Sequence, residues 1–223
     1  MLSIFITQND GYAELTKAGV MAVIILALII VLLIGLFMSR GKKFSAKELS
    51  FAGNALAVAF ALSFVKLFHM PWGGSVTLLS MLFVVLIGYW YGLRVGLTAA
   101  FAYGLLQFVQ GGGDYILSFW QVAFDYLLAF TALGLSGLFS KKKNGLLIGY
   151  LVAVAARGLF HSIGGYLYWM EYMPENFPQQ LSALYPILYN YAYILAEAAI
   201  TVIVISLPPV KKALESVKKM ALE

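Results

Sequence analysis

Apolar residues in this chain occur in long runs that are separated by short polar or basic segments. A helix that crosses the hydrocarbon core of a bilayer needs roughly 20 predominantly apolar residues. The clearest run covers residues 18–38 and contains no charged residue, and Asp10 and Glu14 precede it, so we interpret it as a retained helix rather than a signal peptide. Six further runs lie at residues 49–65, 75–91, 95–110, 116–139, 145–170 and 185–207. The pattern predicts an all-α integral membrane protein with seven spans.

The composition agrees with a membrane location and excludes several kinds of chemistry. Of the 223 residues, 62% are hydrophobic and only 11% are charged, and the mean hydropathy is +0.88. The chain has no cysteine, which excludes disulfides and thiolate chemistry. Its two histidines, His69 and His161, are too few for a multi-histidine metal centre. We therefore expect neither a metal nor a cofactor.

Lysine and arginine gather in alternate connections between the predicted spans, and the net charge is +5. Short connections rich in these residues usually stay in the cytoplasm. The rule predicts a cell-membrane protein with its N-terminus outside and its C-terminus inside. Residues 1–48 would hold the extra helix and a basic linker, residues 49–207 the six-helix domain, and residues 208–223 a basic tail. Lys66 is the exception at an outer end, where it either snorkels to the headgroups or belongs to a site. The basic residues on the predicted cytoplasmic side are Arg40, Lys42, Lys43, Lys47, Arg94, Lys141, Lys142, Lys143, Lys211, Lys212, Lys218 and Lys219.

Polar side chains inside the spans are the candidates for a site, because each is costly in a membrane unless it is paired or used. In the sixth span, Arg157, His161, Gly165 and Trp169 recur every four residues, which places them on one helix face. The glycine allows another backbone or a ligand to approach this face closely. Polar residues in the fifth and last spans are Gln121, Asp125, Tyr126, Tyr185, Tyr189, Asn190 and Glu197.

Each of these residues also has a structural interpretation. Arg157 and Asp125 could form a buried ion pair, His161 could be a packing residue, and the aromatic rings could form an interfacial belt. Glu197 could cap a helix. Taken together, however, an anion, an amide, an imidazole and several rings suit a small, flat and partly cationic aromatic ligand. The sequence shows no nucleophile–base pair with a third member and no phosphate-binding glycine loop, so we expect a binding protein and not an enzyme.

Four stretches and a pair of residues, in this order, resemble the thiamin-specific substrate-binding subunit (S-component) of energy-coupling factor importers: SFVKLFHMPWGGSVTLLSM, YGLRVGLTAAFAYGLLQ, QVAFDYLLAF, HSIGGYLYWMEYMPE, and Tyr185 with Asn190. The resemblance covers roughly residues 49–205. It implies a six-helix S-component bundle, here preceded by one extra N-terminal transmembrane helix. It also implies a thiamin site near the outer face, beneath the loop that follows the first of the six helices.

The resemblance assigns roles to individual residues. Arg157 is expected to be a supporting charge, and Trp72 an aromatic lid residue. An aspartate stands where some relatives have the longer glutamate, which changes the expected distance to the ligand. The residues expected to bind substrate are Trp72, Asp125, Tyr126, His161, Gly165, Trp169, Tyr185 and Asn190.

The family also implies partners, namely a membrane coupling protein and two cytoplasmic ATPase subunits that energise uptake. Docking is expected through small residues on the first of the six helices, Ala55, Ala57, Ala59 and Ala61, which let helices approach closely. The alternatives are an S-component for another vitamin or precursor, and an ion-coupled secondary transporter that uses Arg157, Asp125 and His161 as a relay. Paired repeats, which many such carriers have, are not found in this sequence.

Overall fold

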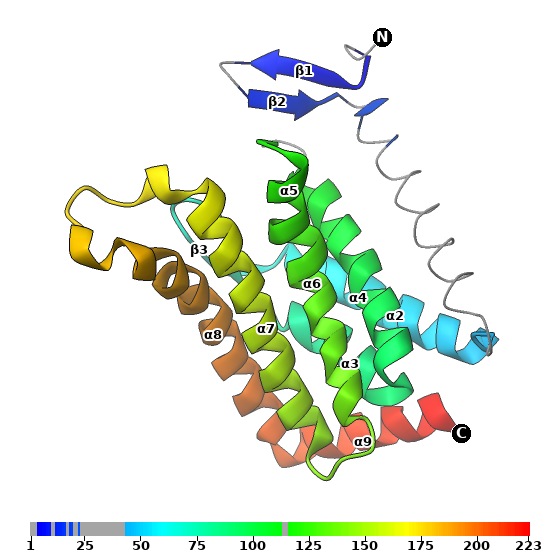
Figure 1. The fold of residues 1–223 in the computed structure, drawn as a ribbon. Coiled ribbons are helices and arrows are strands. Elements are labelled where there is room, and N and C mark those ends of the chain that lie inside the picture. The colour runs from blue at the N-terminus through cyan, green and yellow to red at the C-terminus, as the bar shows by residue number, and fades with distance from the viewer. Residues whose placement is uncertain (1–3, 10–11, 17, 20–21, 23–42, 113–115) are drawn as a thin grey trace.

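Each of the six apolar runs after residue 48 contains a helix, and one further helix follows them. The computed structural model describes residues 4–9, 12–16, 18–19, 22, 43–112 and 116–223, so the predicted span at residues 18–38 lies almost wholly outside the described residues. The main helices, seen in Figure 1, are α2 (Ala46–Ser63), α3 (Ser80–Tyr91), α4 (Leu93–Gln107), a composite helix Phe119–Phe139, α7 (Gly145–Tyr168), α8 (Tyr185–Ser206) and α9 (Pro208–Leu222). Shorter elements are the antiparallel strands β1 (Ile6–Asn9) and β2 (Tyr12–Leu15), and the turns η5 (Met170–Tyr172) and η6 (Gln179–Leu184).

Helices α2 and α3 begin several residues away from the positions that the hydrophobic pattern predicts, and the structure shows a reason for each. Helix α2 starts before its apolar run because Ser45 and Glu48 form a capping box, in which each side chain accepts a hydrogen bond from the other residue's backbone N–H. Helix α3 starts late because Ser75–Thr77 forms strand β4, which pairs with β3 (Lys66–His69) as an antiparallel hairpin. Gly73 and Gly74 have φ of 94° and 79°, a left-handed conformation that glycine adopts without strain, and they form the turn of this hairpin.

Two π-helical segments interrupt the regular helices on the side of the bundle that faces the hairpin. Segment η2 (Phe108–Gly112) extends α4, and η3 (Ala123–Leu128) lies within the composite helix. The rest of the composite helix consists of α5 (Phe119–Val122), α6 (Ala129–Thr131) and the 3₁₀ segment η4 (Ala132–Phe139). Such π-helical segments are rare and occur frequently at functional sites.

Glycines hold the composite helix close to α3 and α4. A Cβ atom built on Gly134 would lie 2.5 Å from the backbone carbon of Gly96, and one on Gly88 would lie 2.3 Å from the Oγ of Ser136. The Ser136 hydroxyl also donates a hydrogen bond of 2.9 Å to the carbonyl of Val85. Small residues and side-chain hydrogen bonds are the usual means of packing helices in a membrane, where lipid is as apolar as the helices.

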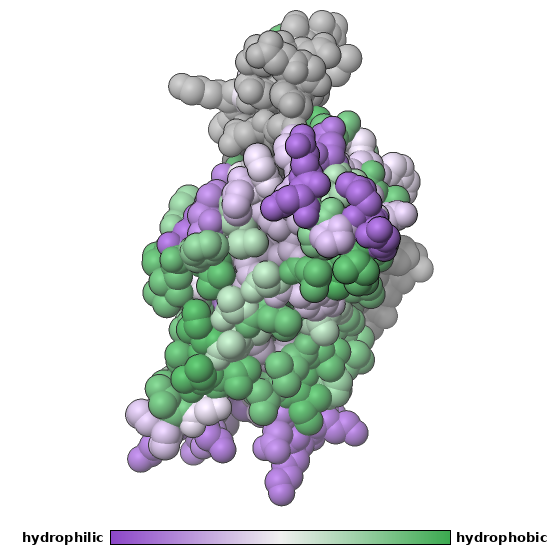
Figure 2. All heavy atoms as spheres, turned by 90° about the vertical axis from the view of Figure 1, so that its left-hand side faces the viewer, coloured by the Kyte–Doolittle hydropathy of each residue, from purple (hydrophilic) through white to green (hydrophobic). Residues whose placement is uncertain are grey.

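The surface of the bundle is that of a multi-pass membrane protein. Among the described residues, three helices are long and apolar enough to cross a membrane: Phe119–Phe139, Gly145–Tyr168 and Gln179–Ser206. Figure 2 shows an apolar belt on one face of the molecule, with hydrophilic residues gathered above and below it. The arrangement of six spans plus one stays a prediction.

The four alanines predicted to dock a partner lie on two different faces of α2. Ala55 and Ala59 are buried inside the bundle, at 6% and 0% exposure, and the hydroxyl of Tyr103 on α4 lies 3.4 Å from the carbonyl oxygen of Ala59. Ala57 and Ala61 are exposed. Docking stays a prediction, and it is compatible with the exposed Ala57 and Ala61 but not with direct contact of a partner with the buried Ala55 and Ala59.

Candidate functional site

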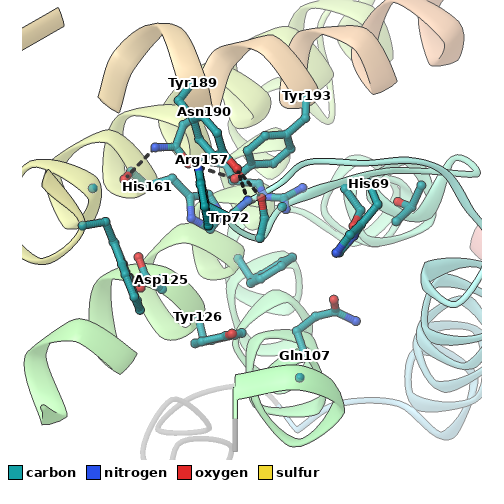
Figure 3. Close-up of a pocket in the computed structure, with 18 of the residues that line it drawn as sticks. His69, Trp72, Gln107, Asp125, Tyr126, Arg157, His161, Tyr189, Asn190 and Tyr193 are labelled. Carbon is teal, nitrogen blue, oxygen red and sulfur yellow. Dashed lines mark hydrogen bonds between the residues drawn. The ribbon is translucent and has the colours of Figure 1, made fainter. Parts of the chain in front are cut away.

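A cavity of about 500 Å³ lies between the β3–β4 hairpin, the two π-helical segments, α7 and α8. All eight predicted substrate-binding residues line it, as does Arg157 (Figure 3). Residues far apart in the sequence thus converge on one space. The lining combines aromatic rings, amides and one carboxylate, which is the composition expected of a small-molecule site.

Asp125 is the one carboxylate among the described residues that line this cavity. It lies in η3, and its Oδ2 accepts two hydrogen bonds of 2.8 Å, from Gln121 Nε2 and from the indole Nε1 of Trp169. Its Oδ1 accepts none from the described residues. Gly164 leaves the space that the carboxylate occupies, because a Cβ atom there would lie 2.6 Å from Oδ1. Two hydrogen bonds thereby fix one carboxylate oxygen, while the other accepts none within the part of the chain that the structure describes.

Arg157 contacts an imidazole and an aromatic ring. Its guanidinium lies 4.4 Å from the centre of the Phe130 ring, and its Nε donates a long hydrogen bond of 3.4 Å to Nε2 of His161. No salt bridge joins Arg157 to Asp125 in the part of the chain that the structure describes, so the interpretation as a buried ion pair is not supported. Since an Arg N–H only donates, Nε2 of His161 accepts, and the ring proton is assigned to Nδ1.

Asn190 and Gly165 hold α7 against α8 beside the cavity. The amide nitrogen of Asn190 donates to the carbonyls of His161 and Pro186, at 3.2 Å and 2.8 Å, and its oxygen accepts from the hydroxyl of Tyr193 at 2.9 Å. A Cβ atom on Gly165 would lie 2.9 Å from Cβ of Pro186. Asn190 therefore holds the backbone of His161 and Gly165 lets α7 approach Pro186, and both residues also line the cavity.

Aromatic rings gather at the C-terminal end of α7. Tyr172 lies between two tryptophans, with ring centres 5.6 Å from Trp72 and 5.7 Å from Trp169. Tyr185 and Tyr189 lie nearby on α8, with their ring centres 5.7 Å apart. Rings in such a group present faces to which a flat cation is attracted.

Several lining residues were not predicted from the sequence. Gln107 donates to Gln110 Oε1 at 2.7 Å and to the Ser63 hydroxyl at 3.1 Å, and the three form a polar cluster on the wall. Glutamines near helix ends are common, so nothing in the sequence marked Gln107 and Gln110 as residues of the cavity wall. Lys66 and His69 on the hairpin also line the cavity, which favours a site role for Lys66 over snorkelling.

Tyr189 was named among the polar residues of the last span but not among the expected ligand contacts, and its clear role is to tie the hairpin turn to α8. Its hydroxyl donates to the carbonyl of Gly73 at 2.9 Å and accepts from the backbone N–H of Trp72 at 3.0 Å. The sequence places Tyr189 four residues after Tyr185, on the same helix face, and this spacing is the signal that could have identified it.

Replacing Tyr189 with phenylalanine is expected to accelerate ligand release by up to about 30-fold, since two hydrogen bonds of about 1 kcal/mol each would no longer hold the turn over the cavity. Stopped-flow fluorescence on the purified protein measures this rate. Tyr191→Phe is the matched control: its hydroxyl bonds to Ala155 at 2.7 Å, and it does not line the cavity. Equal release rates in the two variants would contradict the role of Tyr189.

Glu197 does not line the cavity but supports two elements that do. Its carboxylate accepts hydrogen bonds from the backbone N–H groups of Thr77 and Met81, at 3.0 Å and 3.1 Å, and from the hydroxyls of Thr77 and Ser80, at 2.6 Å and 3.3 Å. It thereby caps the start of α3 and anchors β4. The interpretation of Glu197 as a helix cap agrees with these contacts.

Known proteins resemble this chain over most of its length. It is 30% identical, over 167 residues, to the thiamine transporter ThiT of Bacillus subtilis (strain 168); the match covers 69% of this chain and 84% of that protein. The solved structure of ThiT from Listeria monocytogenes superposes with a TM-score of 0.56 at 25% identity, over 73% of this chain and 94% of that one.

The family model described as thiamine transporter protein matches residues 49–216, which is well over half of the chain. This match begins at the residue predicted to start the six-helix domain and leaves the first 48 residues outside it. The resemblance inferred from the sequence is thus confirmed. The chain belongs to the thiamine transporter protein family.

Proposed function

We propose that this protein binds thiamin in the cavity and serves as the substrate-capturing S-component of an energy-coupling factor importer. The observation that carries the proposal is the Asp125 carboxylate, which lines the cavity beside aromatic rings and accepts both of its hydrogen bonds from described residues through one oxygen. Thiamin joins an aminopyrimidine, which has N–H donors, to a thiazolium ring with a permanent positive charge. A carboxylate oxygen and ring faces are complementary to these two parts.

The assignment of individual contacts follows from the geometry of the cavity. Asp125 Oδ1 accepts a hydrogen bond from the ligand, and the rings of Trp72, Tyr172 and Trp169 surround its cationic part. The centre of the His161 ring lies 6.0 Å from that of Phe130 and 6.3 Å from that of Tyr193. His161 contributes a further ring to the wall of the cavity. Asn190 and Gly165 act through the packing of α7 on α8.

Uptake requires partners beyond this chain. In the proposed arrangement the cavity opens outward in the cell membrane and the basic end lies in the cytoplasm, as the positions of lysine and arginine favour. A membrane coupling protein then docks on the exposed face of α2 that carries Ala57 and Ala61, and two cytoplasmic ATPases supply the energy. The protein performs no reaction on thiamin.

The test is a titration of the purified full-length protein with thiamin, riboflavin, biotin and pantothenate, followed by tryptophan fluorescence. Thiamin alone is expected to quench the signal, because Trp72 and Trp169 line the cavity. Trp120→Phe is a suitable control, since Trp120 is 63% exposed and lies outside the cavity, so the quenching should persist. Tight binding of another vitamin without a response to thiamin would falsify the proposal.

A further inference from the structure

The end of the bundle opposite the thiamin cavity contains a second cavity, of about 410 Å³. It lies between the last turn of α3, the start of α7, the end of α8 and α9. Figure 1 shows α9 crossing this end of the bundle, beneath the helices that it covers. The residues of this second cavity take no part in the thiamin site.

Helix α9 has the properties of a helix that lies in a membrane interface. Pro208 and Pro209 follow the end of α8, and the extended residue Leu207 turns the chain into α9. One side of the helix packs on the bundle: Ala221 is 2% exposed, and its carbonyl accepts a hydrogen bond of 3.1 Å from the Tyr91 hydroxyl. Lys212 and Lys219 are exposed outside the second cavity, whereas Lys211 and Lys218 line it. A polar, basic face opposite an apolar one is typical of helices at the headgroup level.

The second cavity combines an apolar wall with a polar, basic rim. Leucine and isoleucine side chains supply the wall, from Leu86, Leu146, Leu147, Ile205 and Leu214. The rim contains Tyr89, Asn144, Ser206, Lys211, Glu215 and Lys218. An apolar slot with a charged mouth at the membrane interface fits a molecule with an acyl chain and a polar head.

The lysines at this rim are placed to meet an anion. The Lys218 ammonium donates to the Tyr89 hydroxyl at 2.9 Å and lies 4.1 Å from the centre of the same ring, which fixes its position and leaves other N–H donors. Lys211 lies two helical turns earlier on the same face. Within the residues that the structure describes, neither lysine has a carboxylate at salt-bridge distance.

We propose that this second cavity binds an anionic phospholipid, with the phosphodiester held by Lys211 and Lys218 and the start of an acyl chain against the leucine wall. The two lysines and Glu215 leave one net positive charge at the rim, which matches the single negative charge of a phosphodiester. Basic pockets between helices at a membrane surface are suited to such headgroups. The proposal does not depend on thiamin capture.

The test is native mass spectrometry of the full-length protein in detergent, titrated with phosphatidylglycerol and, separately, with phosphatidylcholine. The wild type is expected to retain one phosphatidylglycerol in preference to phosphatidylcholine. Lys211→Gln with Lys218→Gln should weaken this binding about 25-fold, at about fivefold for each lysine. Lys211→Gln alone, which changes an exposed side chain, should weaken it about fivefold.

The matched control is Lys212→Gln with Lys219→Gln, which removes the same charge from the same helix at exposed positions outside the second cavity. It should change phosphatidylglycerol affinity by less than about twofold if the site is local, since exposed charges contribute little. Equal losses in both double variants would show diffuse surface attraction and overturn the proposal. Displacement of the lipid by millimolar glycerol phosphate would also overturn it, because the acyl chain would then contribute nothing. Retained thiamin binding in each variant shows that the fold is intact.

Discussion

Replacing Asp125 with asparagine is expected to weaken thiamin binding by about 100-fold, because hydrogen bonds to a charged group contribute about 1.5–3 kcal/mol and every 1.4 kcal/mol is tenfold in affinity. The amide oxygen can still accept the hydrogen bonds from Gln121 and Trp169 that Oδ2 accepts now. The amide nitrogen would take the place of Oδ1 and present a donor, without negative charge, to the ligand. Fluorescence or calorimetric titration of the purified protein measures the change.

Glu171→Gln is the matched control for this prediction. It makes the same change from carboxylate to amide in the exposed turn η5, near the outer end of the bundle but not on the cavity wall. Its thiamin affinity should equal that of the wild type. If Asp125→Asn also bound thiamin within about twofold of the wild type, the prediction that Asp125 contacts the ligand would be wrong. The proposed function would then be judged by the titration with the four vitamins.

The helix faces of this site could be predicted from sequence because helical periodicity fixes them. His161, Gly165 and Trp169 are spaced four apart, and all three line the cavity, as the spacing predicts. Tyr185 and Asn190 were assigned through the family resemblance, and they also line it. Long apolar runs likewise identified every helix from α2 to α8, since the bilayer sets the length of a span.

The partners of these residues could not be predicted, because they depend on local backbone geometry. Asp125 appeared to be a candidate partner of Arg157, whereas the π-helical segment η3 places it beside Trp169. The alanines of α2 illustrate a second limit. An alternating series of alanines places residues on opposite sides of a helix, and periodicity alone does not say which side faces the bundle.

Contacts across the hairpin could not be predicted either, because β4 lies within the run at residues 75–91 that was assigned to a span, and β3 lies in the short connection before it. The two strands pair because Gly73 and Gly74 turn the chain between them. Tyr189, more than a hundred residues later in the sequence, then holds this turn. The carboxylate of Glu197, which is only 2% exposed, also holds the hairpin. It accepts hydrogen bonds from four groups in β4 and at the start of α3.

Replacing Glu197 with alanine is expected to lower the stability of the protein by about 3–5 kcal/mol, because the N–H groups of Thr77 and Met81 would lose their acceptor in the interior. At about 2–4 °C per kcal/mol, the melting temperature should fall by roughly 6–20 °C. Glu197→Gln should lie between alanine and the wild type, since one side-chain oxygen remains to accept. Thermal unfolding of the detergent-solubilised protein, followed by fluorescence, gives these values. Glu175→Gln, at an exposed position in the connection before η6, is the control and should leave the melting temperature unchanged. If Glu197→Ala melted at the same temperature as Glu175→Gln, the carboxylate would not anchor β4 and α3. The hairpin over the cavity would then be held by Tyr189 instead.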